Sequence, residues 1–272
     1  MSIAAIETQV RTSETPTVGR LTGALYGIVT YVVFAATLAY AILFICGIGL
    51  SSTIDGPAST LGIGAALAIN LALLGLFGIQ HSVMARPAFK RWWTRIIPAS
   101  MERQTYVLAT CVCFGAMFLW WQPMTGVVWS VESVAGTYAI YASRIFGWIF
   151  MASSTILINH LDLFGLRQTW FHWRGKKYEE IGFRTPGWYK RVRHPIQLGF
   201  LIAFWSTPHM TVGAFVFAAV CTAYIIVALW LEERDLTAAF GEQYANYKRQ
   251  VGQLHPFRRY RDSANDSRDS AS

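Results

Sequence analysis

The stretch LTGALYGIVTYVVFAATLAYAILFICGIGL, residues 21–50, contains no charged side chain. A helix needs roughly 20 consecutive apolar residues to cross a bilayer, so this stretch predicts a membrane-spanning helix. The rest of the chain agrees, because only 14% of its 272 residues are charged and its mean hydropathy is +0.35. A soluble domain carries roughly 25% charged residues. These values exclude a soluble doubly wound enzyme.

Further apolar runs follow, and the last of them, residues 194–231, is too long for one helix and about right for two. Pro208 is the natural breakpoint within it. The sequence therefore predicts an all-α, polytopic membrane protein of five to six segments, with a C-terminal helical hairpin. The expected spans are about 21–50, 60–85, 105–121, 138–161, 195–207 and 211–231. They belong to one domain of residues 21–257, between a segment of residues 1–20 and a disordered polar tail at 258–272.

The distribution of Lys and Arg predicts the orientation. Residues 51–59 and 122–137 contain none, whereas residues 86–103 and 162–193 are rich in both. The positive-inside rule then places the basic loops and both termini in the cytoplasm, with no removable signal peptide. The net charge of +8 is explained by the basic cytoplasmic loops and their contact with anionic lipid head groups. It therefore does not indicate nucleic-acid binding. All four cysteines (Cys46, Cys111, Cys113, Cys221) lie in apolar runs, which favours buried thiols over disulfides or metal ligands.

The segment RVRHPIQLGF, residues 191–200, begins the fifth expected span. Proline suits the first position of a helix, so Pro195 predicts that Arg191, Arg193 and His194 surround a helix N-terminus. The free N–H groups there favour an anion. The alternative interpretation is a basic stop before a membrane span.

The segment LEERDL, residues 231–236, lies where the sixth span is expected to leave the membrane. A hairpin would bring Glu232 and Glu233 close to His194. Carboxylates are unfavourable at the C-terminal end of a helix, so the pair indicates a binding partner, unless Arg234 and the lipid interface satisfy it. Downstream, apolar and aromatic side chains predict one face of a helix on the membrane surface; they are Leu236, Phe240, Tyr244 and Tyr247.

Two more segments combine polar and aromatic residues. INHLDLFGLRQTWFHW, residues 158–173, contains His160, Asp162 and Arg167, and GIQHSVMARPAFKRWW, residues 78–93, contains His81. We expect His81 about one turn inside the end of the second span, where a histidine is suited to proton transfer. Each of these side chains is also compatible with an ordinary hydrogen-bonded role in a packed or interfacial helix.

The combination of RHP, EE and FGEQYANYKRQV (residues 240–251) resembles the C-terminal signature of membrane methyltransferases that act on isoprenylcysteine carboxylates and phospholipids. QHSVMARPAFKRWWTRIIP and INHLDLFGLRQTWFHW resemble the bacterial methanethiol S-methyltransferase branch, with more distant similarity to NnrU-type proteins. The resemblance covers about residues 20–257 and implies a bacterial inner membrane protein. The chain departs from the pattern at Gln197, where an aromatic residue is usual, and at VGQLHP, residues 251–256, both near the expected cofactor.

The resemblance implies methyl transfer from S-adenosylmethionine to methanethiol, giving dimethyl sulfide and S-adenosylhomocysteine without a metal. A cationic pocket suits the cofactor carboxylate, and glutamates suit its ammonium and ribose. The expected cofactor residues are Tyr189, Arg191, Arg193, His194, Pro195, Leu198, Glu232, Glu233, Tyr244 and Tyr247. The expected catalytic residues are His81, His160 or Asp162 as proton acceptor, and Arg167 or Arg144 to stabilise the thiolate.

Three alternatives stay open. The same scaffold could methylate another thiol, an isoprenylcysteine carboxylate or a lipid. An NADPH-dependent membrane reductase would need a further phosphate site, which the basic loop 162–193 allows. A transporter would place its polar groups near mid-membrane, whereas here they gather toward the cytoplasmic side, which favours an enzyme. The expected partners are a small volatile thiol and membrane lipid; the sequence gives no oligomeric state.

Overall fold

The computed structural model describes residues 17–256, which are almost entirely helical. The expected tail at 258–272 and most of the expected N-terminal segment lie outside the described residues. The contacts divide the chain into two units. The first unit holds the described residues up to Val131, with Leu161–Glu180 and Pro208–Tyr224; the second holds Glu132–His160, Ile181–Thr207 and the described residues from Ile225.

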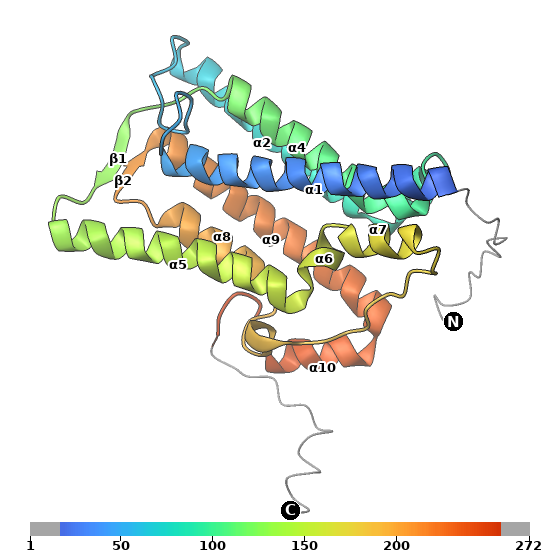
Figure 1. Cartoon of the computed structure of the whole chain (residues 1–272). Helices are drawn as coiled ribbons and strands as arrows, with labels where there is room; N and C mark the ends of the chain where they lie inside the picture. The colour runs from blue at the N-terminus through green and yellow to red at the C-terminus, as the bar shows by residue number, and fades with distance from the viewer. Residues whose placement is uncertain (1–16, 257–272) are drawn as a thin grey trace, which may run out of the picture. The chain divides into compact units, whose positions relative to one another are not determined.

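Three helices of the first unit run side by side: α1 (Thr17–Cys46), α2 (Ile63–Ala85) and α4 (Glu102–Trp120), with α4 in contact with both others (Figure 1). Helix α1 ends four residues before the predicted limit at residue 50, because Gly47 and Gly49 adopt positive φ angles of 70° and 68°. The shorter elements of this unit are α3 (Pro87–Trp93), η2 (Ala99–Met101), β1 (Val127–Ser130), α7 (Leu166–Trp173) and β2 (His209–Thr211). Strands β1 and β2 pair antiparallel, with Val127 opposite Thr211.

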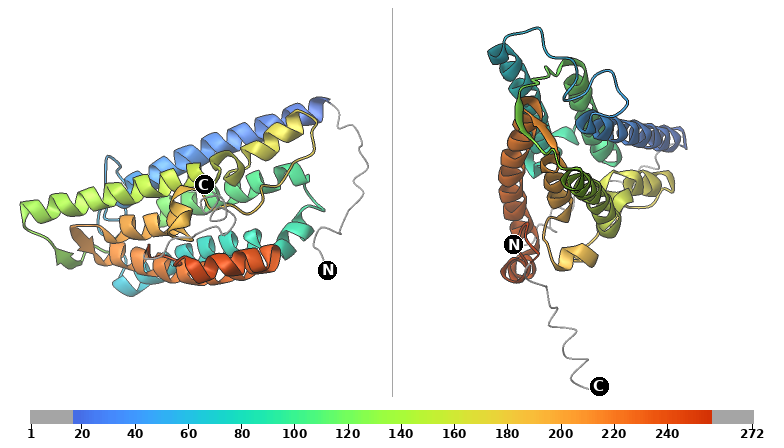
Figure 2. Two further views of the ribbon diagram at one scale, coloured as in Figure 1. Left: turned by 90° about the horizontal axis from the view of Figure 1, so that it is seen from below. Right: turned by 90° about the vertical axis from the view of Figure 1, so that its left-hand side faces the viewer.

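In the second unit, α5 (Val134–Ile158) packs along α8 (Pro195–Trp205) (Figure 2). Their backbones approach so closely that a Cβ atom added at Gly147 would lie 2.7 Å from the Ala203 nitrogen, and one at Gly199 would lie 2.7 Å from Met151. Helix α8 has 11 residues and is about 16 Å long at 1.5 Å per residue, well short of a bilayer core. The expectation of a short fifth segment is confirmed. The 3-10 helix η3 (Gly187–Lys190) precedes α8, and α6 (His160–Leu163) follows α5.

Helix α9 (Val212–Phe240) begins soon after Pro208, as predicted, but it does not end near residue 231. It continues through Glu232 and Glu233 because the following residues contain no helix breaker before Gly241, whose φ is 55°. The prediction that the two glutamates sit at a helix C-terminus is therefore wrong. The prediction that Leu236 to Tyr247 form one surface helix is also wrong, because Gly241 separates α9 from α10 (Glu242–Gln250).

Within residues 17–256, four helices are long and apolar enough to cross a membrane: α1, α2, α5 and α9. No more than a third of the most apolar window of each helix is buried, and large apolar side chains such as Ile28, Ile149 and Ile226 are exposed. Such surfaces suit lipid rather than water. The all-α polytopic membrane fold predicted from the sequence is confirmed.

Candidate functional site

The start of α8 meets α9 through buried charges. Arg193 Nε lies 2.7 Å from Glu233 Oε1, and His194 Nε2 donates to the same oxygen at 3.1 Å. The other histidine nitrogen, Nδ1, lies 3.8 Å from Glu232 Oε2. The prediction that the hairpin brings these glutamates to His194 is confirmed. The side chain of Glu233 is only 7% exposed, whereas that of Glu232 is 45% exposed.

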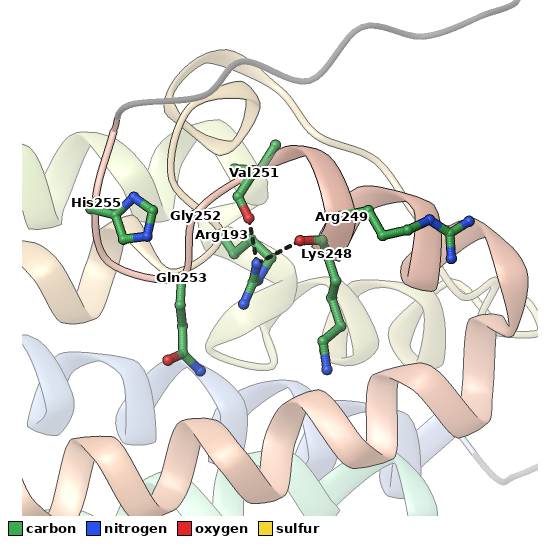
Figure 3. Close-up of a pocket in the computed structure, with 7 residues that line it drawn as sticks. All are labelled: Arg193, Lys248, Arg249, Val251, Gly252, Gln253 and His255. Atoms are coloured by element: carbon green, nitrogen blue, oxygen red, sulfur yellow. Dashed lines mark hydrogen bonds between the residues drawn. The ribbon is translucent and has the colours of Figure 1, made fainter.

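The C-terminal segment contacts both Arg193 and Glu233, and Figure 3 shows its hydrogen bonds with Arg193. Lys248 Nζ lies 3.3 Å from Glu233 Oε2, and Arg193 donates to the carbonyl oxygens of Lys248 and Val251. The backbone N–H of Arg193 donates to the Gly252 carbonyl. Lys248 was not predicted, although its position one helical turn after Tyr244 could have indicated it.

These bonds change the interpretation of the RHP segment. The N–H groups of Arg193 and His194 already bond to the carbonyls of Gly252 and Gln253, so they are not free for an external anion. The anion that Arg193 holds is Glu233 of the chain itself. Pro195 occupies the start of α8 as predicted, and Leu198, in the first turn, donates its N–H to the His194 carbonyl.

Tyrosines of α10 and η3 lie beside the charged cluster. Tyr247 donates its hydroxyl to the Tyr189 carbonyl at 2.5 Å, and Tyr189 donates to the Ser154 carbonyl at 3.4 Å. The hydroxyl of Tyr244, by contrast, is buried with no hydrogen-bond partner among the described residues. Burial raises the pKa of both Tyr244 and Tyr189, and the charges of Glu233 and Glu232, respectively, raise them further. Both phenols are therefore neutral at pH 7.

The aromatic face predicted around Tyr244 exists, although two helices build it. Tyr244, Tyr247 and Val251 form its buried centre, and Leu236, Phe240 and Phe183 pack against them. The ring of Phe183 stands edge-on to those of Tyr244 and Tyr247 at 5.8 and 5.3 Å. This packing fixes α10 against the end of α9.

A cavity of about 370 Å³ opens at the charged cluster. Figure 3 shows the side chains of Lys248 and Gln253 pointing to the same side, whereas that of Arg249 points away. The lining residues are Arg193, Lys248, Arg249, Val251, Gly252, Gln253 and His255. The lining is rich in cationic groups, and four of its members belong to residues 251–256, the segment that departs from the family pattern.

Arg191 does not join this cavity. It is exposed and lines a separate groove with Trp188 and the last turns of α5. Its neighbours in sequence, Val192 and Arg193, turn instead toward Gly252. The structure therefore brings Arg193 and His194 together but not Arg191, whose role as a cofactor residue stays a prediction.

Two predicted catalytic residues, Asp162 and Arg167, lie together in the first unit. Asp162 Oδ1 accepts a hydrogen bond from Tyr178 at 2.6 Å and lies 3.4 Å from Arg167 and from Gln168. Burial raises the pKa of Tyr178 to about 12, and the hydrogen bond to Asp162 contributes. The guanidinium of Arg167 lies over the Tyr178 ring, 5.3 Å from its centre. Asp162 is thus tied into a local network.

His81 lies four residues before the end of α2, as predicted. The hydroxyl of Tyr106 lies 2.7 Å from its Nε2 and 2.9 Å from its Nδ1, and the Thr110 hydroxyl lies 3.3 Å from Nδ1. The ring stacks on Phe77 with centres 5.2 Å apart. Sequence reasoning missed Tyr106, which was hidden within an apolar run of α4.

The remaining candidates belong to the second unit. His160 Nδ1 lies 2.9 Å from the Thr155 hydroxyl, and burial lowers the pKa of His160, which keeps the imidazole neutral at pH 7. Arg144 is buried in α5 and donates from Nε to the Ala203 carbonyl at 3.3 Å. In the part of the chain that the structure describes, no group of three His, Cys, Asp or Glu residues is arranged to hold a metal.

Comparison with known proteins identifies the family. No protein-family model matches the chain, and no solved structure matches it. It is 49% identical over 233 residues to a methanethiol S-methyltransferase of Mycobacterium tuberculosis, covering 86% of this chain and 95% of that protein. A methanethiol S-methyltransferase of Crocosphaera subtropica is 46% identical, with 86% of this chain and 91% of that protein covered. Nurim of Rattus norvegicus is 28% identical over 183 residues, or 63% of this chain and 68% of Nurim. The chain therefore belongs to the methanethiol S-methyltransferase family.

Proposed function

We propose that this protein transfers a methyl group from S-adenosylmethionine to methanethiol, which yields dimethyl sulfide and S-adenosylhomocysteine. Two of the relatives reported above carry methanethiol in their names and match most of this chain. The structural observation that carries the proposal is the cluster of Arg193, His194 and Glu233, with Glu232 exposed beside it. Such a cluster is costly to build unless its groups are used.

The residues present fit a zwitterionic cofactor. Arg193 and Lys248 are cations lining the cavity, and such groups suit a carboxylate. The carboxylate of Glu232, 45% exposed, suits an ammonium or ribose hydroxyls. The unpartnered hydroxyl of Tyr244 supports a ligand here, because a buried hydroxyl usually has a partner.

In this proposal each residue of the cluster has a separate task. Arg193, His194 and Lys248 hold Glu233 ionised and fixed, and Arg193 also holds the chain around Val251. Glu232 is left to contact the ligand. When bound, S-adenosylmethionine supplies a methyl group activated by its sulfonium. The protein has to bind and orient both reactants, which is where most of its contribution to rate lies.

The thiol has to lose its proton, because a thiol with a pKa above roughly 8.5 is mostly protonated at pH 7. His81, His160 and Asp162 stay the candidates for the acceptor. The neutral imidazole of His160 suits that role, whereas Asp162 already accepts a short hydrogen bond from Tyr178. Arg167 and Arg144 stay the candidates for stabilising the thiolate, and Arg144 already donates to a backbone carbonyl.

We place the reaction at the cytoplasmic side of the membrane, on the basis of the Lys and Arg residues in loops 86–103 and 162–193, and in a bacterial inner membrane because the related methanethiol S-methyltransferases are bacterial. A polar cofactor would then enter from the cytosol. Methanethiol is small and apolar, so it would reach the site through the lipid.

The test is direct. The full chain, purified in a neutral detergent, is incubated with methanethiol and methyl-deuterated S-adenosylmethionine, and the headspace is analysed by mass spectrometry. We expect dimethyl sulfide with one deuterated methyl group, and none when either reactant is omitted. The Glu232→Gln variant serves as a weakened control. If the label instead appears in the lipid fraction and no dimethyl sulfide forms, the acceptor in this proposal is wrong.

A further inference from the structure

A second, apolar groove lies in the second unit, apart from the charged cavity. Its volume is about 540 Å³, and its lining residues are Ser153, Ile156, Leu157, Gly187, Trp188 and Arg191. The first three belong to the end of α5, and the others belong to η3 and the residue after it. The walls are apolar, apart from the hydroxyl of Ser153, which donates to the Phe150 carbonyl.

Arg191 gives this groove its charge. Its side chain is exposed and makes no ion pair or hydrogen bond among residues 17–256, in contrast to Arg193 two positions later. No carboxylate lines the groove, so its lining carries a net positive charge. A guanidinium at the edge of an apolar groove is suited to a ligand with an apolar body and an anionic group.

The position of the groove indicates which ligand that is. Helix α5 is long and apolar enough to cross a membrane, and the groove lies along its last two turns, before Ile158. The end of a spanning helix lies at the level of the phospholipid head groups. Trp188 is 44% exposed beside it, and tryptophan is enriched at that level.

We propose that this groove binds an anionic phospholipid, with an acyl chain along Ile156, Leu157 and Trp188 and the phosphate at Arg191. A zwitterionic lipid offers the same chains and phosphate, but its ammonium would be repelled by Arg191. Anionic lipids are therefore bound more tightly. This site is independent of the proposed methyl transfer, and it gives Arg191 a role that the cofactor cavity does not.

The experiment measures lipid binding by native mass spectrometry of the full chain in a neutral detergent. The probes are phosphatidylglycerol and phosphatidylcholine with identical acyl chains. We expect the first phosphatidylglycerol to bind more tightly than the first phosphatidylcholine. Arg191→Gln should weaken phosphatidylglycerol binding about fivefold, the usual contribution of one basic residue near a membrane surface. Its phosphatidylcholine binding should not change.

Two matched variants make the result specific. Lys190→Gln removes the same charge from the exposed neighbouring residue, which does not line the groove, and should behave like the parent protein. Ile156→Ala shortens an exposed wall residue and should weaken both lipids equally. Equal losses in Lys190→Gln and Arg191→Gln would overturn the proposal, because the attraction would then be a general surface charge effect. Unchanged lipid binding together with weaker S-adenosylhomocysteine binding in Arg191→Gln would also overturn it.

Discussion

Glu233 lies 2.7 Å from Arg193, although 40 positions separate the two residues in the sequence. The same guanidinium donates to carbonyls of Lys248 and Val251, so one buried ion pair joins the start of α8, the last third of α9 and the end of α10. Glu232, the adjacent residue, takes part in none of these bonds to Arg193. The two glutamates are therefore expected to respond differently to the same substitution.

Glu232→Gln should weaken S-adenosylhomocysteine binding about tenfold, because a hydrogen bond to a charged group contributes roughly 1.5–3 kcal/mol. The melting temperature in detergent should stay unchanged, since the side chain is 45% exposed. Isothermal calorimetry and a thermal unfolding scan measure the two quantities. Undiminished affinity would remove Glu232 from the ligand site.

Glu233→Gln should lower the melting temperature by several degrees as well as the affinity. Removing one partner of a buried pair leaves Arg193 uncompensated, at a cost of about 3 kcal/mol. Arg234→Ala is the control, because Arg234 is exposed and its pair with Asp235 is worth at most about 1 kcal/mol. Equal melting temperatures for both variants would contradict the structural role of the Arg193–Glu233 pair.

Tyr244→Phe and Tyr247→Phe remove the same atom from two adjacent buried rings. Among residues 17–256, the Tyr247 hydroxyl has a hydrogen-bond partner and the Tyr244 hydroxyl has none, so Tyr247→Phe should lose about 1 kcal/mol of stability. Tyr244→Phe removes a hydroxyl that has no partner, and should keep or raise stability while weakening S-adenosylhomocysteine binding about fivefold. If Tyr244→Phe instead lowered the melting temperature and left S-adenosylhomocysteine binding unchanged, the Tyr244 hydroxyl would not face the ligand.

The motifs predicted the hairpin contact well, because RHP and EE flank two apolar runs that have to return to the same membrane face. The break at Gly241 was harder to foresee. The apolar spacing from Leu236 to Tyr247 fits one helix, and it is the positive φ of Gly241 that divides it into two. Arg191 lines a different groove from Arg193, because closeness in the sequence does not determine the direction in which each side chain leaves the backbone.

Gly199→Ala should destabilise the protein by about 2 kcal/mol, since the new methyl group would overlap Met151 of α5. The displacement of α8 should also weaken S-adenosylhomocysteine binding, because His194 stands at its start. Gly75→Ala in α2 is the matched control, with open space around the new methyl group and a better helix former in place of glycine. If thermal unfolding shows equal stability for both variants, α5 and α8 are not in such close contact.

The proton acceptor can be identified by pH dependence. His160→Asn retains a group able to bond the Thr155 hydroxyl but loses Nε2, and His81→Gln retains one able to bond Tyr106. In the variant that lacks the acceptor, turnover at pH 7 should fall about 100-fold, the usual contribution of a general base. Binding of S-adenosylhomocysteine should stay close to normal, because the thiol is what loses the proton.

The defect should shrink as the pH rises toward the thiol pKa, since the solution then supplies thiolate without the acceptor. Burial lowers the pKa of His160, so raising the pH does not remove this base from the parent protein. In Asp162→Asn we expect turnover not to recover at high pH. This substitution disrupts the hydrogen bond from Tyr178, and a change in side-chain position is not reversed by raising the pH. The measurement is the turnover number from pH 6.5 to pH 9 at saturating methanethiol. Normal turnover at pH 7 in all three variants would exclude these residues as acceptors. The proposed cofactor residues would not be affected by that result.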